Sequence, residues 1–344
     1  MIEDLQVRIT AIKQNTGDSK SFYLEPLTGA LTYKAGQFIT FMLEIDGKEV
    51  RRSYSFSSTP GIDPVPFVTI KRIQNGYISR HLFDHAQEGD VLDVLPPGGR
   101  FVLEETGTAH QFFIAAGTGI TPIFSLIKSV LHHHHSKVTL VNQNTDEHRS
   151  MFRNELLLLK QQYPNRFTLV ELFSQPLNEA IAPRRLNNWV VEQLLQQYAG
   201  TTPVHFYLCG PIAFMQMVYI TLRFIGYVDD QVSRENFTVS AVPPPPLMTD
   251  VTPKTVGVHL KNEYFRFPVA YPQNILQAAL MHGVVLPYSC RGGRCSTCAA
   301  ICKTGRVKMS INEVLTERDL RKGLVLTCVA FAETDVELDF NLHL

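Results

Sequence analysis

The chain has 344 residues with 44% hydrophobic side chains, and its 32 lysine and arginine residues balance 32 aspartate and glutamate residues. This length favours two or three domains, and a net charge of zero argues against nucleic acid or an anionic membrane as a partner. No segment approaches the ~20 apolar residues that cross a bilayer, and the first residues do not form a signal sequence. We therefore expect a soluble cytoplasmic protein.

Residues 1–105 have the pattern of short strands joined by tight turns. The strand-like stretches are 5–12, 20–25, 37–45, 67–73 and 90–95, and the turns include TGD, DGK and PPGG. Strands of this length and spacing are typical of an antiparallel β-barrel or sandwich.

Residues 106–238 alternate apolar strands with helical stretches. Strands are expected at 112–116, 138–143, 167–174 and 204–209, and each is followed by a helix, at 121–131, 151–162, 187–198 and 211–224. This alternation predicts an α/β domain with a parallel sheet wrapped by helices.

A proline-rich stretch at 239–254 predicts a linker to a third domain, residues 255–344. Pro243–Pro246 should form a stiff spacer of about 12 Å at ~3.1 Å per residue. The last domain has strand-like stretches at 256–260 and 264–271, a helical stretch at 274–283, and a strand-rich end that includes 325–331 and 334–340.

The last domain holds a cysteine cluster on a loop rich in glycine and arginine, SCRGGRCSTC. Three cysteines there have the spacing C-x4-C-x2-C, and a fourth follows in LVLTCVA. This is the spacing of plant-type [2Fe–2S] ferredoxins, in which four thiolates hold two irons. Gly292 and Gly293 permit a tight loop with positive φ where it is needed, and backbone N–H groups in such a loop can point at an anionic cluster. The predicted ligands are Cys290, Cys295, Cys298 and Cys328.

Three other interpretations of these cysteines stay open. A structural zinc site usually pairs one C-x2-C with another or with histidines, disulfides are rare in a reducing cytosol, and a glycine-rich loop is a poor place to bury unliganded thiols. Cys302 does not fit the ferredoxin pattern. We expect a spare buried thiol there, and the alternative is that it replaces Cys298 as a ligand.

The stretch FFIAAGTGITPIF runs from an apolar strand through a glycine turn, Gly117 to Gly119, into a helix. We expect Thr121 to cap this helix and Pro122 to occupy its first position. A strand, a glycine turn and a helix N-terminus form an anion site that suits a pyrophosphate. Some turns of this kind are only tight connections.

A second turn, in LCGPIAFM, supports the nucleotide interpretation. Cys209 and Gly210 should end a parallel strand and Pro211 should start a helix. Both turns would then open at the carboxyl edge of one sheet, where ligands of open α/β sheets bind. A cysteine that ends a buried strand can alternatively be a small apolar filler.

The strand RRSYSFSS places Arg52 and Tyr54 on one face and Ser55 on the other face or at the rim. A cation for phosphate beside a flat aromatic ring suits a flavin. The alternative is a surface strand with solvated charges and hydroxyls.

Taken together, RxYS at 52–55, GYIS at 76–79, PPGGRF at 96–101, GTGITP at 117–122 and CGP at 209–211 resemble the ferredoxin-NADP reductase family. Residues 255–344 resemble the plant-type ferredoxin family. The first resemblance implies an FAD-binding antiparallel β-barrel and an NAD(P)-binding α/β domain, and the second implies an α+β β-grasp domain.

The resemblance also implies roles for individual residues. Tyr54 would stack on the isoalloxazine, Arg52 would pair with the flavin pyrophosphate, and Ser55 would lie near the flavin N5. Ser55 and Cys209, the latter beside the nicotinamide, would be the catalytic residues. Contacts with FAD or the nicotinamide nucleotide are further implied for Ile70, Lys71, Arg72, Gly76, Ser79, Gly117, Thr118, Gly119, Thr121, Ser174, Gly210 and Pro211.

The choice between NADH and NADPH stays open. The places at which NADPH-using relatives carry arginines for the 2′-phosphate hold Asn144, Ser174 and Gln175 here. Arg184 and Arg185 could substitute for them, but an exposed helix start explains these two residues equally well. No acidic residue is evident there for a ribose 2′-hydroxyl.

The run His132–His135 follows a predicted helix and is internal to the chain. We expect a solvated helix end, with a metal site as the alternative.

These parts together predict an NAD(P)H-dependent oxidoreductase in which a hydride passes to FAD and electrons then pass singly to the [2Fe–2S] cluster and to a protein acceptor. The order of reductase before ferredoxin resembles the reductases of phenylacetyl-CoA epoxidase and related hydroxylases, which implies an oxygenase component as the acceptor. A reductase for a hybrid-cluster protein or another redox partner, and a redox sensor without turnover, are the alternatives. We assign no general base.

Overall fold

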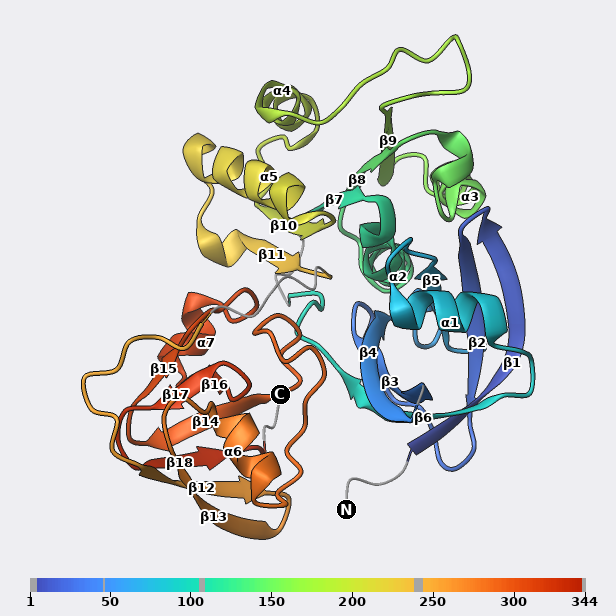
Figure 1. Cartoon of the computed structure of the whole chain (residues 1–344). Coiled ribbons are helices and arrows are strands. Elements are labelled where there is room, and N and C mark those ends of the chain that lie inside the picture. Colours follow the sequence, from blue (N-terminus) through green and yellow to red (C-terminus); the bar gives the residue numbers. More distant parts are fainter. Residues whose placement is uncertain (1–4, 46, 105–108, 238–243, 342–344) are drawn as a thin grey trace. The chain divides into compact units, whose positions relative to one another are not determined.

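The computed structural model describes residues 5–45, 47–104, 109–237 and 244–341, and Figure 1 shows the course of the chain. The chain forms two compact units, residues 1–237 and 238–344. Residues 239–243 of the expected linker lie outside the described residues, so the expected proline spacer is described only from Pro244 onward. No helix in the described part of the chain is long and apolar enough to cross a membrane.

A six-stranded antiparallel barrel opens the first unit, as the sequence predicts. Its strands follow the order β4-β3-β6-β1-β2-β5, and a bridge between Phe56 and Val68 joins the end of β4 to β5, so that the sheet closes on itself. Alternate side chains such as Ile9, Leu24 and Ile39 fill its interior. The strands are β1 Leu5–Thr16, β2 Ser19–Pro26, β3 Phe38–Ile45, β4 Lys48–Ser55, β5 Phe67–Lys71 and β6 Val91–Gly98.

Two features of the barrel differ from the prediction. Pro96 and Pro97 belong to β6 and not to a turn, and the register of β3 against β6 shifts between Phe38 and Thr40 at this point. Proline cannot donate a ladder hydrogen bond, so an irregular register accommodates the pair. The prediction also lacks helix α1, Tyr77–His85, a helix of 9 residues in which Leu82 is the only buried apolar side chain.

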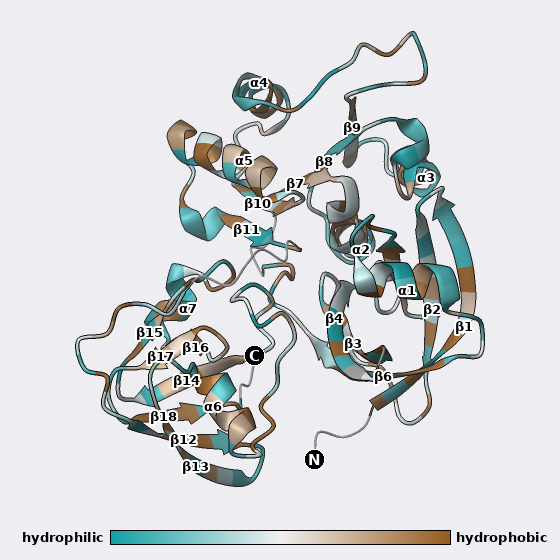
Figure 2. Ribbon diagram, viewed as in Figure 1, coloured by the Kyte–Doolittle hydropathy of each residue, from teal (hydrophilic) through white to brown (hydrophobic). Residues whose placement is uncertain are grey.

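A five-stranded parallel sheet, in the order β11-β10-β7-β8-β9, forms the rest of the first unit. In β7, Phe113 and Ala115 pack with α2 and α3, whereas Phe112 and Ile114 pack with α4 and α5, so helices cover both faces as predicted. Figure 2 shows the apolar character of these central strands. The elements are β7 His110–Ala116, α2 Ile120–His133, β8 Val138–Asn144, α3 Arg153–Gln162, β9 Phe167–Phe173, α4 Asn188–Tyr198, β10 Val204–Cys209, α5 Ile212–Ile225 and β11 Val232–Glu235.

Helix α2 begins earlier than predicted. Gly117 has a φ of 55°, which turns the chain at the end of β7, and Gly117–Gly119 form a 3-10 turn that continues into α2 at Ile120. Thr121 therefore lies inside the helix and is not its cap. Its hydroxyl donates to the carbonyl of Thr118 at 3.0 Å. At the other end of α2, His132–His135 are exposed, as expected of a solvated helix end.

The second unit is an α+β domain of the expected kind. Its main sheet has the order β13-β12-β18-β14-β16, with β12 and β18 parallel, and β15 pairs with β17. A capping box between Asn274 and Gln277 starts helix α6, which buries Ile275 and Leu276 in the core. The elements are β12 Lys254–Leu260, β13 Glu263–Val269, α6 Ile275–Met281, β14 Ala299–Thr304, β15 Val307–Met309, α7 Glu317–Arg321, β16 Leu324–Leu326, β17 Ala330–Ala332 and β18 Val336–Asp339.

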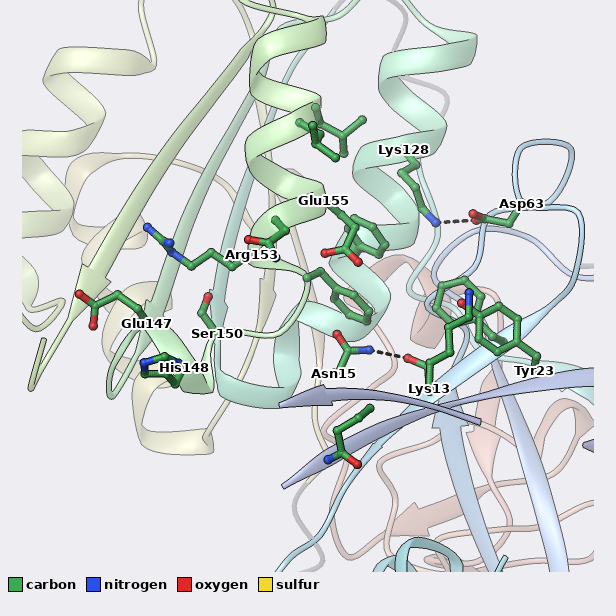
Figure 3. Close-up of a pocket in the computed structure, with 18 of the residues that line it drawn as sticks. Lys13, Asn15, Tyr23, Asp63, Lys128, Glu147, His148, Ser150, Arg153 and Glu155 are labelled. Atoms are coloured by element: carbon green, nitrogen blue, oxygen red, sulfur yellow. Dashed lines mark hydrogen bonds and ion pairs between the residues drawn. The ribbon is translucent and has the colours of Figure 1, made fainter. Parts of the chain in front are cut away.

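A polar seam joins the barrel to helix α2. The Ser125 hydroxyl donates to the carbonyl of Ser58 at 2.6 Å, and the Thr59 hydroxyl donates to the carbonyl of Ser125 at 3.0 Å. One turn further along α2, the ammonium of Lys128 pairs with Asp63 (Figure 3). Because α2 starts directly after the glycine turn, these contacts fix the position of that turn relative to the barrel.

The pair between Lys128 and Asp63 generates a stability prediction. The Lys128 side chain is 7% exposed and its ammonium lies over the rings of Phe67 and Phe124. Asp63→Asn leaves this cation buried without its partner and should cost about 3–5 kcal/mol, whereas Lys128→Met places an apolar chain between the rings and should cost far less. Urea unfolding followed by far-UV circular dichroism measures both changes. A Lys128→Met protein as unstable as Asp63→Asn would contradict this account.

Candidate functional site

The end of β4 meets the end of the first unit, and two of the predicted flavin residues take part in that contact. A guanidinium nitrogen of Arg52 donates to the carbonyl of Phe237 at 3.1 Å. The Ser55 hydroxyl donates to Glu235 Oε2 at 3.3 Å. The structure thus brings the predicted flavin strand of the barrel next to residues that follow the parallel sheet.

Tyr54 and Ser57 provide the test of whether this strand suits a flavin. The hydroxyl oxygens of both residues are buried and have no hydrogen-bond partner within the described residues. Burial raises the pKa of Tyr54 above its ordinary value, so the phenol stays protonated. A buried hydroxyl without a partner costs about 1–3 kcal/mol. The half-buried ring of Tyr54 and its hydroxyl without a partner suit a polar ligand with a flat ring system.

The predicted phosphate strand, which is the end of β5 and the residue that follows it, offers fewer free groups than expected. Ile70 is fully buried in the barrel core, so only its backbone can face a ligand. Lys71 pairs with Asp18 at 3.3 Å, and Arg72 forms a two-pronged pair with Asp84. The hydrogen bond from Arg72 lowers the pKa of Asp84. Both cations are therefore already neutralised, and a pyrophosphate would have to compete with these carboxylates.

Gly76 and Ser79 lie together at the start of α1. Gly76 is the N-cap residue, and the hydroxyl of Ser79 donates to its carbonyl at 3.2 Å. A Cβ on Gly76 would lie only 2.3 Å from that hydroxyl. The first N–H groups of a helix attract anions, so this turn is consistent with the predicted pyrophosphate contact.

The two glycine turns of the parallel sheet are in direct contact. A Cβ on Gly119 would lie 1.9 Å from the carbonyl oxygen of Cys209, and a Cβ on Gly210 would lie 3.0 Å from the Cβ of Ala116. Pro211 is the N-cap residue of α5. Only glycine lets the ends of β7 and β10 approach this closely, and their shared carboxyl edge is where open α/β sheets bind ligands.

Glu235 is the functional candidate that the sequence analysis missed. It lies opposite Cys209 in the parallel register of β11 against β10, and it accepts the hydrogen bond from Ser55. Although part of the residue is exposed, its carboxyl group is enclosed, and this burial raises its pKa to about 8. Burial, reinforced by Glu235, also raises the pKa of the Cys209 thiol.

The sequence contains little to reveal Glu235. It belongs to a short edge strand in SREN, where a charged residue is normally solvated. Its position depends on β11 pairing with β10, and no local pattern encodes that pairing. Ser55, Cys209 and Glu235 form a cluster in which the first two residues are buried and the carboxyl group of the third has a raised pKa.

The expected coenzyme-selecting positions lie at the ends of β8 and β9. Asn144 is buried and donates to Ser150 at 3.2 Å, so its amide already has a partner. The backbone N–H of Ser174 donates to the carbonyl of Asn144 at 3.1 Å. Arg184 and Arg185 are exposed. Neither Asn144 nor Ser174 therefore offers a cation to a 2′-phosphate.

The four predicted cluster cysteines converge in the second unit. The backbone N–H of Cys290 donates to Cys295 Sγ at 3.5 Å, and the thiol of Cys328 lies within hydrogen-bonding reach of Cys290 and Cys298. Cys328 lies in the turn between β16 and β17 and not on a strand as expected, because the ladder is interrupted at residues 327–329. All four sulfur atoms are therefore presented by loops.

The electrostatics of these thiols suit a cluster of iron and sulfide. Hydrogen bonds from Cys295 and Cys328, together with backbone N–H groups of Gly292 and Arg294, lower the pKa of Cys290. The same proximity raises the pKa of Cys328. Its side-chain hydrogen bonds with Cys290 and Cys298 favour the protonated thiol. Four adjacent thiolates repel one another and need compensating positive charge, which bound iron would supply.

The alternatives to this ligand set are less consistent with the structure. Cys302 is half-buried and not buried as expected, since its place near the end of β14 leaves the sulfur against the carbonyls of Thr304 and Gly305. Within the described ranges, no three His, Cys, Asp or Glu side chains are grouped to ligate a single ion. A two-iron cluster does not need such a group, because each iron takes two protein thiolates.

A separate cavity of about 720 Å³ lies in the first unit, between the strands β1 and β2 and the helices α2 and α3 (Figure 3). Its lining includes Lys13, Glu147, Arg153 and Glu155. None of the flavin, nucleotide or cluster residues predicted from the sequence lines it. The cavity is therefore distinct from the paired turns and from the cysteine loop.

Three family models match the chain. They describe an oxidoreductase FAD-binding domain over residues 6–103, an oxidoreductase NAD-binding domain over residues 113–219, and a 2Fe-2S iron-sulfur cluster binding domain over residues 258–333. Their order agrees with the order of the barrel, the parallel sheet and the second unit.

Two relatives match nearly the whole chain. The ferredoxin reductase component of 3-ketosteroid-9-alpha-monooxygenase from Rhodococcus rhodochrous is 32% identical and covers 95% of this chain and 94% of its own. A component of 1,2-phenylacetyl-CoA epoxidase from Escherichia coli K12 is 32% identical, with coverages of 92% and 91%. The solved structure of phthalate dioxygenase reductase shares the fold, with a TM-score of 0.61 at 22% identity over 98% of both chains.

The unsatisfied hydroxyl and half-buried ring of Tyr54 generate a binding prediction. Tyr54→Ala should weaken FAD binding at least about fivefold, because the stacking of an aromatic pair is worth ~1 kcal/mol beyond area burial. Tyr54→Phe keeps the ring and should retain most of the affinity. Fluorescence titration of the FAD-depleted proteins measures both, and unchanged affinity in Tyr54→Ala would exclude a stacking role.

The raised pKa of Glu235 generates a pH prediction. Between its ordinary value near 4.5 and about 8, the folded protein keeps a proton that the unfolded chain has lost. Stability is therefore full at low pH and falls as pH rises to about 8, by up to ~1.4 kcal/mol per pH unit. Glu235→Gln should lack this dependence, so urea unfolding from pH 5 to 9 should show the two proteins diverging. Parallel pH profiles would mean that Glu235 is ordinarily ionised.

Proposed function

Because the chain belongs to the family of ferredoxin reductase components of oxygenases, we propose that it carries electrons from NADH or NADPH to a terminal oxygenase component. It is an NAD(P)H-dependent oxidoreductase whose cofactors are FAD, a [2Fe–2S] cluster and the pyridine nucleotide. The observation that carries the proposal is the convergence of four thiols in the same chain as two glycine turns in contact. A protein that moves electrons between these groups needs both.

When bound, FAD accepts a hydride and releases electrons one at a time, which links a two-electron nicotinamide to a one-electron cluster. In the proposed assignment, Tyr54 and Arg52 hold and orient the flavin. The paired turns at Gly119 and Cys209 receive the nicotinamide end of the nucleotide. The Ser55 hydroxyl donates to Glu235, and the raised pKa of this carboxyl group keeps a proton on it near neutral pH.

The cluster ligands proposed are Cys290, Cys295, Cys298 and Cys328. Their backbone surroundings favour the anionic form of the site, since the N–H of Gly292 donates to Cys290 Sγ at 3.4 Å. All 6 cysteines are free thiols, and a reducing compartment would keep them available for iron. We accordingly propose that the protein is located in the cytoplasm.

The substrate of the terminal oxygenase stays outside the proposal. The relatives from Rhodococcus rhodochrous and Escherichia coli are components of a 3-ketosteroid monooxygenase and of a phenylacetyl-CoA epoxidase, so their names agree on the kind of acceptor and differ on its substrate. The feature they share is delivery of electrons to an oxygenase, and that is the function we assign.

Cys295→Ser tests the assignment of the cluster and of the electron path together. The variant should lose the iron, the sulfide and the visible bands of the cluster, and its reduction of cytochrome c by NAD(P)H should fall at least about tenfold. Bleaching of FAD by NAD(P)H should continue, because the flavin residues lie in the other unit.

Cys302→Ser is the matched control, because it removes a thiol from the same domain at a half-buried position outside the ligand set. It should keep the cluster and full cytochrome c reduction. Loss of flavin reduction in an FAD-loaded Cys295→Ser protein would contradict the separation of the two sites. Negligible turnover by a wild-type chain with full FAD and iron content would contradict a reductase.

A further inference from the structure

The cysteine loop carries a buried arginine that the proposed electron path has not yet used. The Arg294 side chain is only 5% exposed, and its Nε donates to Oε2 of Glu313 at 2.9 Å. Arg294 directly precedes Cys295. A buried charge costs several kcal/mol unless it is well paired. The enclosed guanidinium therefore depends on Glu313 as its partner.

The loop is shaped to hold this guanidinium. A Cβ on Gly292 would lie 2.7 Å from Nη1 of Arg294, so the glycine makes room for the cation. The backbone N–H of the same Gly292 donates to Cys290 Sγ at 3.4 Å. The guanidinium of Arg294 thus lies next to Gly292, whose N–H group is hydrogen-bonded to the sulfur of the proposed ligand Cys290.

Glu313 belongs to a segment that supports both cysteine stretches. Its backbone N–H donates to the carbonyl of Gly293 at 3.1 Å, and the N–H of Ser310 donates to the carbonyl of Val329, next to Cys328, at 3.0 Å. A Cβ on Gly293, which has a φ of 73°, would lie 3.0 Å from the side chain of Ile311. The ion pair is therefore part of a segment that is hydrogen-bonded both to the cysteine loop and to the turn that contains Cys328.

We infer that Arg294 and Glu313 are positioning residues whose opposite charges offset each other, so that neither charge alone shifts the reduction potential of the cluster. Reduction adds one negative charge, which a buried cation stabilises and a buried carboxylate opposes, and both effects are strong where water is excluded. The pair keeps either charge from acting alone. This inference rests on the proposed assignment of the cluster to the four cysteines.

The test is an EPR-monitored redox titration of the full chain, loaded with FAD and cluster. Arg294→Gln should lower the midpoint potential and Glu313→Gln should raise it, each by about a tenfold change in the reduction equilibrium, or 59 mV for a one-electron couple. The double variant Arg294→Leu with Glu313→Leu should return close to the wild-type value. Arg294→Lys keeps the charge and should shift the potential least.

Arg291→Gln is the matched control. Arg291 lies in the same loop next to Cys290 and carries the same charge, but it is exposed and stacks on Tyr288 at 4.4 Å. Its loss should change the potential much less than the loss of Arg294, because solvent screens an exposed charge. Shifts of the same sign in the Arg294→Gln and Glu313→Gln proteins, equal shifts for Arg291 and Arg294, or loss of the cluster even in Arg294→Lys would each overturn the inference.

Iron and sulfide content separates this inference from the proposed function. A wild-type chain that binds two irons and reduces cytochrome c supports the function whatever the potentials of the variants. A wild-type chain without iron contradicts the function itself.

Discussion

The first unit depends on one close approach of backbone to backbone, that of Gly119 to the carbonyl of Cys209. A side chain on Gly119 would overlap this oxygen at 1.9 Å, so the absence of a Cβ is what lets β7 and β10 end in contact. This contact sets where α2 begins, and α2 in turn holds the barrel through Ser125 and Lys128. The position of the barrel strand β4 relative to the sheet follows from it.

Charge in this chain is balanced locally as well as overall. Lys71, Arg72 and Lys128 are each paired with an aspartate, and Arg294 is paired with Glu313. Pairing of this kind leaves few isolated buried charges, and it makes the exceptions informative. Glu235 is an exception, because its enclosed carboxyl group accepts from the neutral hydroxyl of Ser55 and has a raised pKa.

The sequence predicts the parts of this structure that are encoded locally. The strand and helix alternation of the parallel sheet, the barrel strands and the spacing of the cysteines all follow from short-range patterns, and the structure agrees with them. The errors occur where a distant contact decides the outcome. Thr121 loses its capping role because the turn starts at Gly117, and Cys328 lies in a turn because the ladder stops on either side of it.

Individual site residues follow the same division. The convergence of the four cysteines could be predicted because three of them share one loop, whereas Glu235 could not, since its place opposite Cys209 exists only once β11 pairs with β10. Likewise, the cations at Lys71 and Arg72 suggest a phosphate site in the sequence, and only the structure shows that Asp18 and Asp84 already neutralise them.

The two units differ in the kind of charged group that lies near their proposed sites. The first unit has a titratable carboxyl group, and the second has an arginine that stays charged. The titratable group of the first unit is the carboxyl of Glu235, whose pKa burial raises to about 8. Transfer of single electrons changes only charge. Fixed charges suffice for that task, and the buried guanidinium of Arg294 is of this kind because an arginine does not lose its proton in proteins. A titratable group in that position would couple the potential of the cluster to pH, and an arginine avoids this coupling.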